Sequence, residues 1–210
     1  MSLEESNTFR DNRIKAILIG NQGVGKTNLI NISMGKEFDL NSKSTVSPNY
    51  SQKKIEYNGI NYFLEIWDTI GQEKLRTINK LFYKNSKIVI LVYDITNLYS
   101  FQDLKAWVQE IDTQLGLNNV IKGVVGNKID LYFDEKVNEA DGKAFAESIG
   151  ADFLHTSAKS DPSGIFLDFL TNLMKKYIDL YLTDKTSKQN GITLNYAQTF
   201  KKRKKASCCK

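Results

Sequence analysis

A glycine-rich loop, Gly20–Thr27, restricts the fold of this chain more than any other segment. It follows an apolar run, Ile14–Ile19, and leads into Asn28–Ile32, so the order is strand, loop, helix. Glycines let successive backbone N–H groups turn toward an anion, and the helix N-terminus beyond them adds partial positive charge. Lys26 supplies a cation for phosphates and Thr27 a hydroxyl for a magnesium ion. The alternative is a plain glycine turn, but the full GxxxxGKT pattern in this context predicts nucleotide phosphate binding.

The charge of the chain is concentrated near one end. Of 29 basic and 24 acidic residues, the segment 183–210 holds eight basic residues and one acid, which leaves 21 basic and 23 acidic residues in 1–182. A near-neutral body with a basic tail argues against a nucleic-acid-binding face and favours a tail that meets an anionic surface. At 210 residues, 41% hydrophobic and 25% charged, a single soluble globular domain is expected.

Both cysteines, Cys208 and Cys209, are adjacent in the basic tail. Neighbours so placed cannot cross-link a fold, and a body without cysteine is typical of a reducing compartment. The segment Met1–Glu5 is acidic and polar, unlike a secretory signal. We therefore expect a cytosolic protein.

Hydrophobic patterning predicts an α/β domain. Tyr50–Tyr57 and Ile60–Asp68 flank Asn58-Gly59, a strong hairpin signal. Ile88–Tyr93 and Val120–Val125 are near-continuous β-branched runs, as in strands buried on both faces of a parallel sheet. A mostly parallel sheet with one antiparallel edge hairpin is expected.

Helices are predicted between and after these strands. Ser100–Leu115 is expected to be a helix capped by Ser100, and a further helix is expected near Asn138–Ile149. A short strand, Asp152–Thr156, precedes a last helix whose apolar residues share one face. They are Phe166, Phe169, Leu170, Leu173 and Tyr177. We expect a flexible N-terminus over 1–12, a folded domain over 13–182 and a disordered tail over 183–210.

Two short segments indicate which base is bound. Asn127–Asp130 follows a buried strand, where ligands bind in open α/β sheets. A carboxylate at Asp130 can accept from both N1–H and the 2-amino group of guanine, a donor pair that adenine lacks. Ser157–Lys159 ends the next strand and places backbone N–H groups near the base oxygen. An Asp in a loop is often only a turn residue, but the two segments together favour GTP over ATP. A P-loop kinase or ATPase is the more distant alternative.

With these motifs the chain resembles the Rab family of small GTPases, in the Ras superfamily, over roughly 13–182. The resemblance rests on GNQGVGKT at 20–27, Thr45, WDTIGQE at 67–73, YDIT at 93–96, NKID at 127–130 and TSAK at 156–159. Ala106–Glu110, Ala146–Ala151 and His155–Ser157 are most similar to the endocytic branch of the Rab-five and Rab-twenty-one types. The resemblance to the Rab family implies a P-loop NTPase G domain, with a six-stranded, mostly parallel sheet, one antiparallel edge strand and helices on both faces.

The resemblance also implies roles for individual residues. Thr27 and Thr45 would ligate Mg²⁺, with Asp68 acting through water, while Gly71 would contact the γ-phosphate and Gln72 would orient the attacking water. The nucleotide-binding residues so implied are Gln22, Gly23, Val24, Gly25, Lys26, Thr27, Asn28, Phe38, Thr45, Gly71, Asn127, Lys128, Asp130, Ser157, Ala158 and Lys159.

The implied function is a switch that cycles between GTP and GDP, with Mg²⁺, and regulates vesicle-mediated, endocytic membrane traffic. Its slow hydrolysis would be accelerated by a GTPase-activating protein. The other implied partners are an exchange factor, a GDP-dissociation inhibitor (GDI), a Rab escort protein and effectors that bind the switch segments. No nucleic acid is expected as a partner. The implied location is the cytoplasmic face of endosomes or other vesicles, with a cytosolic pool bound to GDI.

The chain departs from the family pattern at Ile70, where Ala is usual in the DTAGQ motif. A tolerated hydrophobic exchange is one interpretation. The other is that a β-branched side chain there disturbs the geometry of Gln72 and its water. The chain would then be a nucleotide-locked scaffold with negligible hydrolysis.

Other positions leave alternatives open. Ser47-Pro48-Asn49 replaces a glycine-containing segment and suggests a narrow set of effectors. Aromatic side chains at Tyr50, Trp67 and Phe82 match effector-facing positions of the family or are plain packing residues. The lone histidine, His155, is assigned no chemistry.

The tail has the composition of a membrane anchor. Lys201–Lys205 is a basic run followed by Cys208 and Cys209, and a CaaX box would need cysteine at 207, which is Ser. The Cys pair resembles the double-geranylgeranyl sites of Rabs, and two lipids anchor where one is marginal. A nuclear localisation signal is the alternative interpretation of the basic run.

Overall fold

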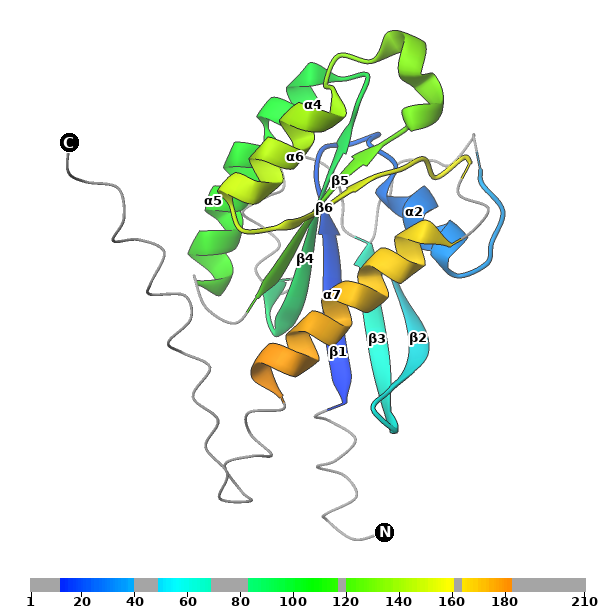
Figure 1. Cartoon of the computed structure of the whole chain (residues 1–210), viewed down its shortest axis with the longest axis vertical. Coiled ribbons are helices and arrows are strands. Elements are labelled where there is room, and N and C mark those ends of the chain that lie inside the picture. Colours follow the sequence, from blue (N-terminus) through cyan, green and yellow to red (C-terminus); the bar gives the residue numbers. More distant parts are fainter. Residues whose placement is uncertain (1–11, 40–48, 69–82, 117–119, 161–163, 183–210) are drawn as a thin grey trace, which may run out of the picture. The chain divides into compact units, whose positions relative to one another are not determined.

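The computed structural model describes residues 12–39, 49–68, 83–116, 120–160 and 164–182. Six strands form one sheet in the order β2-β3-β1-β4-β5-β6 (Figure 1). Their bounds are β1 Arg13–Ile19, β2 Asn49–Tyr57, β3 Ile60–Asp68, β4 Ser86–Asp94, β5 Ile121–Asn127 and β6 Asp152–His155. All neighbouring pairs are parallel except β2 and β3. The predicted sheet of six strands with one antiparallel edge strand is confirmed.

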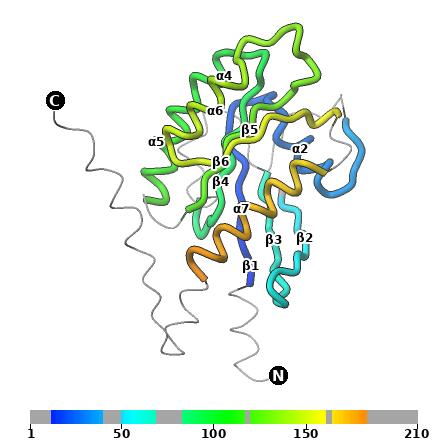
Figure 2. The backbone as a smooth tube through the Cα atoms, in the orientation of Figure 1, coloured from blue at the N-terminus to red at the C-terminus, as the bar shows by residue number. Residues whose placement is uncertain are grey.

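The hairpin of β2 and β3 turns at the two residues that predicted it. Asn58 and Gly59 have φ values of 52° and 74°. Positive φ at both central residues gives the backbone twist that matches paired strands, and Asn-Gly tolerates it best. Figure 2 shows this turn at the end of the sheet opposite the loop that follows β1. The hairpin therefore extends the edge of the sheet without covering the ends where a ligand would bind.

The order in which strands are added to the sheet reverses at β1. β1 has β3 on one side and β4 on the other, and the chain reaches β3 through α2 and β2 before it continues to β4. Such a switch point is where open α/β sheets bind ligands, beyond the carboxyl ends of the strands. The loop that follows β1 is the glycine-rich loop, Gly20–Thr27, hereafter the phosphate loop.

Helices cover both faces of the sheet. The helical bounds are α2 Lys26–Ser33, α4 Leu98–Gln102, α5 Leu104–Leu115, η2 Ile129–Asp134, α6 Glu139–Ser148 and α7 Ile165–Tyr181. Ile17, Leu91 and Val124 belong to one buried cluster with residues of α5 and α6. The opposite face receives α7, because a Cβ on Gly123 of β5 would lie 3.0 Å from Leu173 and Phe169. Figure 1 shows α7 crossing the sheet on one side, with α4, α5 and α6 gathered away from it.

The predicted helix over Ser100–Leu115 is corrected in two respects. The structure has two helices, α4 and α5, which meet at Asp103, and the first begins before Ser100. Asn97, not Ser100, is the N-cap, since its side chain accepts from the N–H of Ser100. The Ser100 hydroxyl instead donates to the carbonyls of Asp94 and Asn97 at 3.3 and 2.7 Å. The prediction was wrong because both residues are good caps and the sequence does not show which one faces the end of β4.

The later elements agree with their predictions within a residue or two. Asn138 caps α6, accepting from Asp141 N at 2.8 Å. In α7, Phe166, Leu170, Leu173 and Tyr177 are buried, and Phe169 is partly buried. The chain divides into two units, Met1–Tyr177 and Ile178–Lys210, and residues 178–182 are the described part of the second. None of the described helices has the length and apolarity that crossing a bilayer requires.

Candidate functional site

The phosphate loop is shaped by glycines that approach their neighbours closely. Gly20 has φ 141°, and a Cβ there would lie 2.1 Å from the carbonyl oxygen of Val92 in β4. Gly25 has φ 96°, and its Cβ would lie 2.3 Å from Nδ2 of Asn127. Such contacts exclude any side chain. Gln22 and Gly23 are exposed and Val24 is buried, so the middle of the loop faces outward from a fixed base.

Lys26 is held in place by the loop itself. Its ammonium donates to the carbonyls of Gly20 and Asn21 at 2.8 and 2.9 Å, and the residue is only 6% exposed. A buried ammonium needs partners of this kind, because an isolated charge is costly to desolvate. The loop therefore positions a cation directly beside its own backbone, as phosphate binding requires.

Thr27 and Asp68 form the oxygen pair expected of a magnesium site. The Thr27 hydroxyl donates to Asp68 Oδ2 at 2.7 Å, which joins the start of α2 to the end of β3. Asp68 is 5% exposed. Mg²⁺ prefers oxygen donors and usually keeps several waters. A hydroxyl and a nearly buried carboxylate side by side fit this ion, bound directly or through water.

Asn127 connects the phosphate loop to the Ser157–Lys159 segment. Its Nδ2 donates to the carbonyl of Val24 at 2.8 Å, and its Oδ1 accepts from the N–H of Ala158 at 3.0 Å. The residue is 1% exposed, so both bonds lie away from water. One side chain thus fixes three segments that are far apart in the sequence.

Asp130 and Ser157 are bonded directly to each other at the expected base site. The Ser157 hydroxyl donates to Asp130 Oδ1, and the same hydroxyl oxygen accepts from the N–H groups of Lys159 and Ser160 at 3.1 and 3.3 Å. Asp130 lies in the first turn of η2 and is partly exposed, while the Lys159 side chain is exposed. Ser157 therefore orients the carboxylate that would read guanine.

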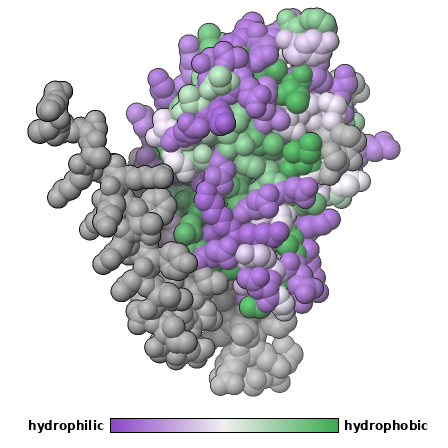
Figure 3. Space-filling model, viewed as in Figure 1, coloured by the Kyte–Doolittle hydropathy of each residue, from purple (hydrophilic) through white to green (hydrophobic). Residues whose placement is uncertain are grey.

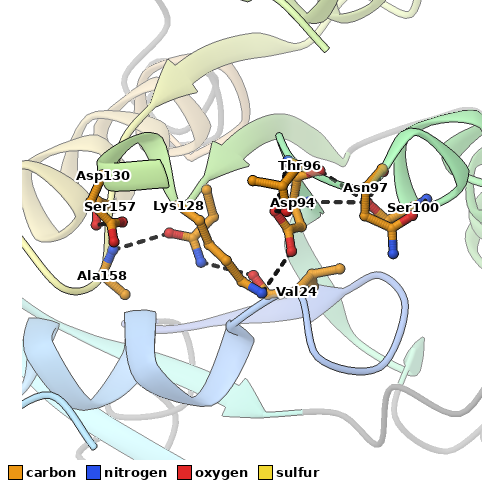
Figure 4. Close-up of polar contacts among 10 residues, drawn as sticks. Val24, Asp94, Thr96, Asn97, Ser100, Lys128, Asp130, Ser157 and Ala158 are labelled. Atoms are coloured by element: carbon orange, nitrogen blue, oxygen red, sulfur yellow. Dashed lines mark hydrogen bonds and ion pairs between the residues drawn. The ribbon is translucent and has the colours of Figure 1, made fainter. Parts of the chain in front are cut away.

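Lys128 is held by an ion pair with Asp94. Its Nζ lies 2.6 Å from Asp94 Oδ2, and Asp94 Oδ1 accepts from the N–H and the hydroxyl of Thr96 at 2.9 and 2.8 Å. Lys128 has φ 73°, a left-handed conformation that non-glycine residues rarely adopt. Figure 4 shows Lys128 pointing to Asp94, beside the bonds that Val24 and Ala158 each make with Asn127. The ion pair holds the Lys128 side chain beside the end of β4.

The segment after α2 carries Phe38, one of the residues that the resemblance implies for nucleotide binding. Phe38 is partly buried, and the next residue, Asp39, accepts through its carbonyl from Asn28 Nδ2 at 3.0 Å. Asn28 is 8% exposed. In the structure, Asn28 fixes this segment against α2. Contact of Phe38 and Asn28 with a nucleotide stays a prediction.

Several predicted residues lie outside the described part of the chain. They are Thr45, Ser47, Pro48, Ile70, Gly71, Gln72, Phe82, the basic run Lys201–Lys205, and the cysteines Cys208 and Cys209. Their roles in metal binding, hydrolysis, effector contact and lipidation stay predictions.

Tyr50 and Trp67 form a stacked aromatic pair on the hairpin. Their ring centroids are 5.3 Å apart, and Lys15 lies 4.4 Å from the centroid of the Trp67 ring. Burial lowers the pKa of Lys15, and the carboxylate of Glu65 acts in the opposite direction. Tyr50 is 55% exposed, so the pair packs on one side and presents an aromatic surface on the other. Contact with effectors and plain packing, the two interpretations of these residues, are both compatible with this geometry.

Sequence reasoning missed the residues that support the site from behind. Asn21 Oδ1 accepts from Trp107 Nε1 at 2.8 Å, and Asp94 pairs with Lys128. Neither partner could be found from spacing, although the YDIT motif at 93–96 marks Asp94 as a strand-end carboxylate. The apolar residues of η2 were also missed: Leu131, Tyr132 and Phe133 are 40%, 60% and 86% exposed. Figure 3 shows green and pale atoms over this helix.

Comparisons with known proteins identify the family of this chain. The model of the Ras family matches residues 15–176. Ras-related protein Rab-21 of Canis lupus familiaris and of Homo sapiens are each 38% identical over 179 residues. These alignments cover 84% of this chain and 78% and 77% of the relatives. Ras-related protein Rab-21 of Mus musculus is 37% identical over the same length, with 84% of this chain and 78% of the relative covered. The phosphate loop, the Asp130–Ser157 pair and these matches lead to one conclusion: the chain belongs to the Ras family and is a small GTPase of the Rab type.

Proposed function

We propose that this chain is a GTP-hydrolysing switch that regulates endocytic membrane traffic. The observation that carries the proposal is the pair of bonds made by Asn127, which brings the phosphate loop and the Ser157–Lys159 segment to one edge of the sheet. A loop for phosphates and a carboxylate for guanine, fixed to each other, describe a binding site for one whole nucleotide.

Base selection is assigned to Asp130. Its carboxylate would accept from N1–H and the 2-amino group of guanine, while Ser157 supports it from the other side. A site built to bond a donor pair rejects a base that lacks it, because buried acceptors are then left unsatisfied. GTP and GDP are therefore the expected ligands, and ATP is not.

Phosphate and metal binding are assigned to the phosphate loop and to β3. Lys26 would attract the outer phosphates, and Thr27 with Asp68 would hold Mg²⁺ together with Thr45. When bound, this ion would neutralise charge on the phosphate oxygens. Gln72 is proposed to orient the attacking water and Gly71 to contact the γ-phosphate. Phosphoryl transfer to water needs positioning of the reacting groups more than covalent chemistry, and these residues would position the phosphates, the ion and the attacking water.

The switching role follows from where those residues lie in the sequence. Thr45 and Gly71–Gln72 belong to polar segments. Contact with the γ-phosphate could order these segments, and loss of the γ-phosphate could release them. The proposed partners are an exchange factor, a GTPase-activating protein, a GDP-dissociation inhibitor, a Rab escort protein and effectors. Slow intrinsic hydrolysis and its acceleration are properties of Ras proteins and are expected here on that basis.

Single-turnover hydrolysis of bound GTP by the full-length protein tests the proposal. Slow hydrolysis that Gln72→Leu abolishes, without loss of GTP binding, is the expected result. Ile70→Ala tests the departure from the family motif: a faster rate would show that the β-branched side chain disturbs the water geometry, and an equal rate would show that it is tolerated.

The same assay distinguishes the alternative function. Retention of GTP with no hydrolysis, in the native chain and in Gln72→Leu alike, would establish a nucleotide-locked scaffold. Binding of ATP as tight as that of GTP would contradict the guanine site itself.

A further inference from the structure

Helix α5 reaches the phosphate loop through a buried pair of side chains. Trp107, near the start of α5, donates from its indole Nε1 to Asn21 Oδ1 at 2.8 Å. Trp107 is 3% exposed and Asn21 6% exposed. An indole has one N–H and no acceptor, so this bond satisfies the only polar group of the ring. The pair is a specific connection between two elements that are 86 residues apart.

Asn21 also helps to hold Lys26. The backbone carbonyl of Asn21 accepts from the Lys26 ammonium at 2.9 Å, next to the carbonyl of Gly20 at 2.8 Å. A lysine has a long, flexible side chain, so the place of its charge depends on the groups that bind it. The side chain of Asn21 is thus fixed by Trp107, while its main chain fixes Lys26.

The base of the loop has two supports of different origin. Gly20 lies against the carbonyl of Val92 in β4, where a Cβ would come within 2.1 Å. Asn21 is bonded to the Trp107 side chain, which packs in the same buried cluster as Ile19 and Leu91. The sheet therefore supports the first carbonyl that holds Lys26, and helix α5 supports the second.

We propose that Trp107 is a positioning residue for the phosphates: by fixing Asn21, it keeps the Asn21 carbonyl where it places Lys26, and so slows release of the nucleoside diphosphate. The inference rests on the proposed function. It is specific to phosphate, because the base-reading segments are joined to the loop through Val24 and not through Asn21.

The test measures release of a fluorescent GDP analogue from the full-length protein, together with the melting temperature. Trp107→Phe removes the donor and Asn21→Leu removes the acceptor; each should speed release by about tenfold, as expected for a buried hydrogen bond. The double variant should be little faster than either single one, because both remove the same bond. Asn21→Asp keeps an acceptor and should restore slow release. GDP affinity should fall more than GMP affinity, since Lys26 acts on the outer phosphate.

A matched control separates positioning from general loss of stability. Ile111→Val removes a methylene from the same helix and the same core cluster, and should lower the melting temperature while GDP release stays unchanged. If Trp107→Phe does not fold, comparing GDP release from Asn21→Leu with release from Asn21→Asp still tests the inference. The inference is overturned if Asn21→Leu releases GDP at the native rate, or if release in all variants follows the melting temperature alone. A native chain that binds no guanine nucleotide overturns the proposed function itself, and is recognised before any variant is made.

Discussion

At Asp130, the proposed specificity for guanine depends on one carboxylate whose position Ser157 supports. Asp130→Asn exchanges one acceptor oxygen for an NH₂ donor, which opposes the guanine N1–H and 2-amino group but matches the 2-oxygen of xanthine. GTP affinity should fall by about 100-fold or more, and xanthosine triphosphate should become the better ligand. Competition between the two triphosphates for the purified protein measures the exchange.

A control for this prediction is available at the neighbouring hydroxyl. Ser157→Ala removes a hydrogen bond to Asp130 but keeps the carboxylate, so it should weaken GTP binding by about tenfold or less without favouring xanthine. An unchanged preference for guanine over xanthine in Asp130→Asn would contradict the role assigned to Asp130.

Among the elements, β5 and α6 approach each other closely because of two glycines around Tyr93. A Cβ on Gly126 or Gly142 would lie 2.6 or 2.2 Å from the Tyr93 hydroxyl oxygen. Phe153 and His155 of β6 border the same space. Large and small side chains therefore alternate here, and a side chain at either glycine has no room.

Gly142→Ala should destabilise the protein by about 1–3 kcal/mol, the usual cost of an overpacked core. Tyr93→Phe removes the nearest atom, and that hydroxyl has no hydrogen-bond partner within the described residues. The double variant should therefore recover part of the loss. Denaturant unfolding of the four proteins measures both effects, and equal losses in Gly142→Ala with and without Tyr93→Phe would contradict the packing account.

The same tyrosine predicts how these elements respond to alkali. Burial raises the pKa of Tyr93 well above its ordinary value of 10.0, and the carboxylates of Glu135, Asp141 and Glu139 act in the same direction. The folded protein therefore keeps a proton that the unfolded chain loses above pH 10. Its contribution to stability is complete below that pH and is lost as pH rises further.

Denaturant unfolding at pH 8, 10 and 11 checks this expectation. The native chain should lose more stability above pH 10 than Tyr93→Phe, which has no proton to lose at this position. A parallel decline in the two proteins would show that Tyr93 does not contribute to alkaline sensitivity.

For the whole molecule, the proposed membrane cycle depends on the tail. Eight basic residues and the Cys208-Cys209 pair lie in 183–210, whereas 1–182 is near neutral. Cys208→Ser with Cys209→Ser should move the protein from the membrane to the soluble fraction of cells, because two lipid chains are the proposed stable anchor. Fractionation measures the partition, and GTP binding should be unchanged.

A second variant distinguishes the two interpretations of the basic run. Replacing Lys201–Lys205 with glutamine should weaken attraction to anionic vesicles and leave nuclear content unchanged. Loss of the protein from nuclei, with membrane binding intact, would favour a localisation signal instead.

Local patterns were sufficient to predict the elements and the motifs. Asn58-Gly59 predicted the hairpin, the β-branched runs predicted buried strands, and the phosphate loop with Asp130 predicted a guanine nucleotide site. The hairpin and the buried strands are confirmed because turn geometry and burial on both faces depend on residues close together in sequence. The nucleotide site stays a prediction. The start of α4 was predicted wrongly, since Asn97 and Ser100 are both good caps and only the end of β4 selects between them.

By itself, the sequence determined the fold class and the phosphate loop, and it predicted Asp130 as the base-reading residue. The tertiary structure alone decided how these parts support each other: the strand order around β1, the two bonds of Asn127, the Asp94–Lys128 ion pair and the Trp107–Asn21 bond. These contacts join residues from different strands and helices, and their geometry exists only once the sheet has set the distances between its strand ends. A motif can show which side chains are suited to a nucleotide, whereas the packed sheet and helices determine where those side chains are held.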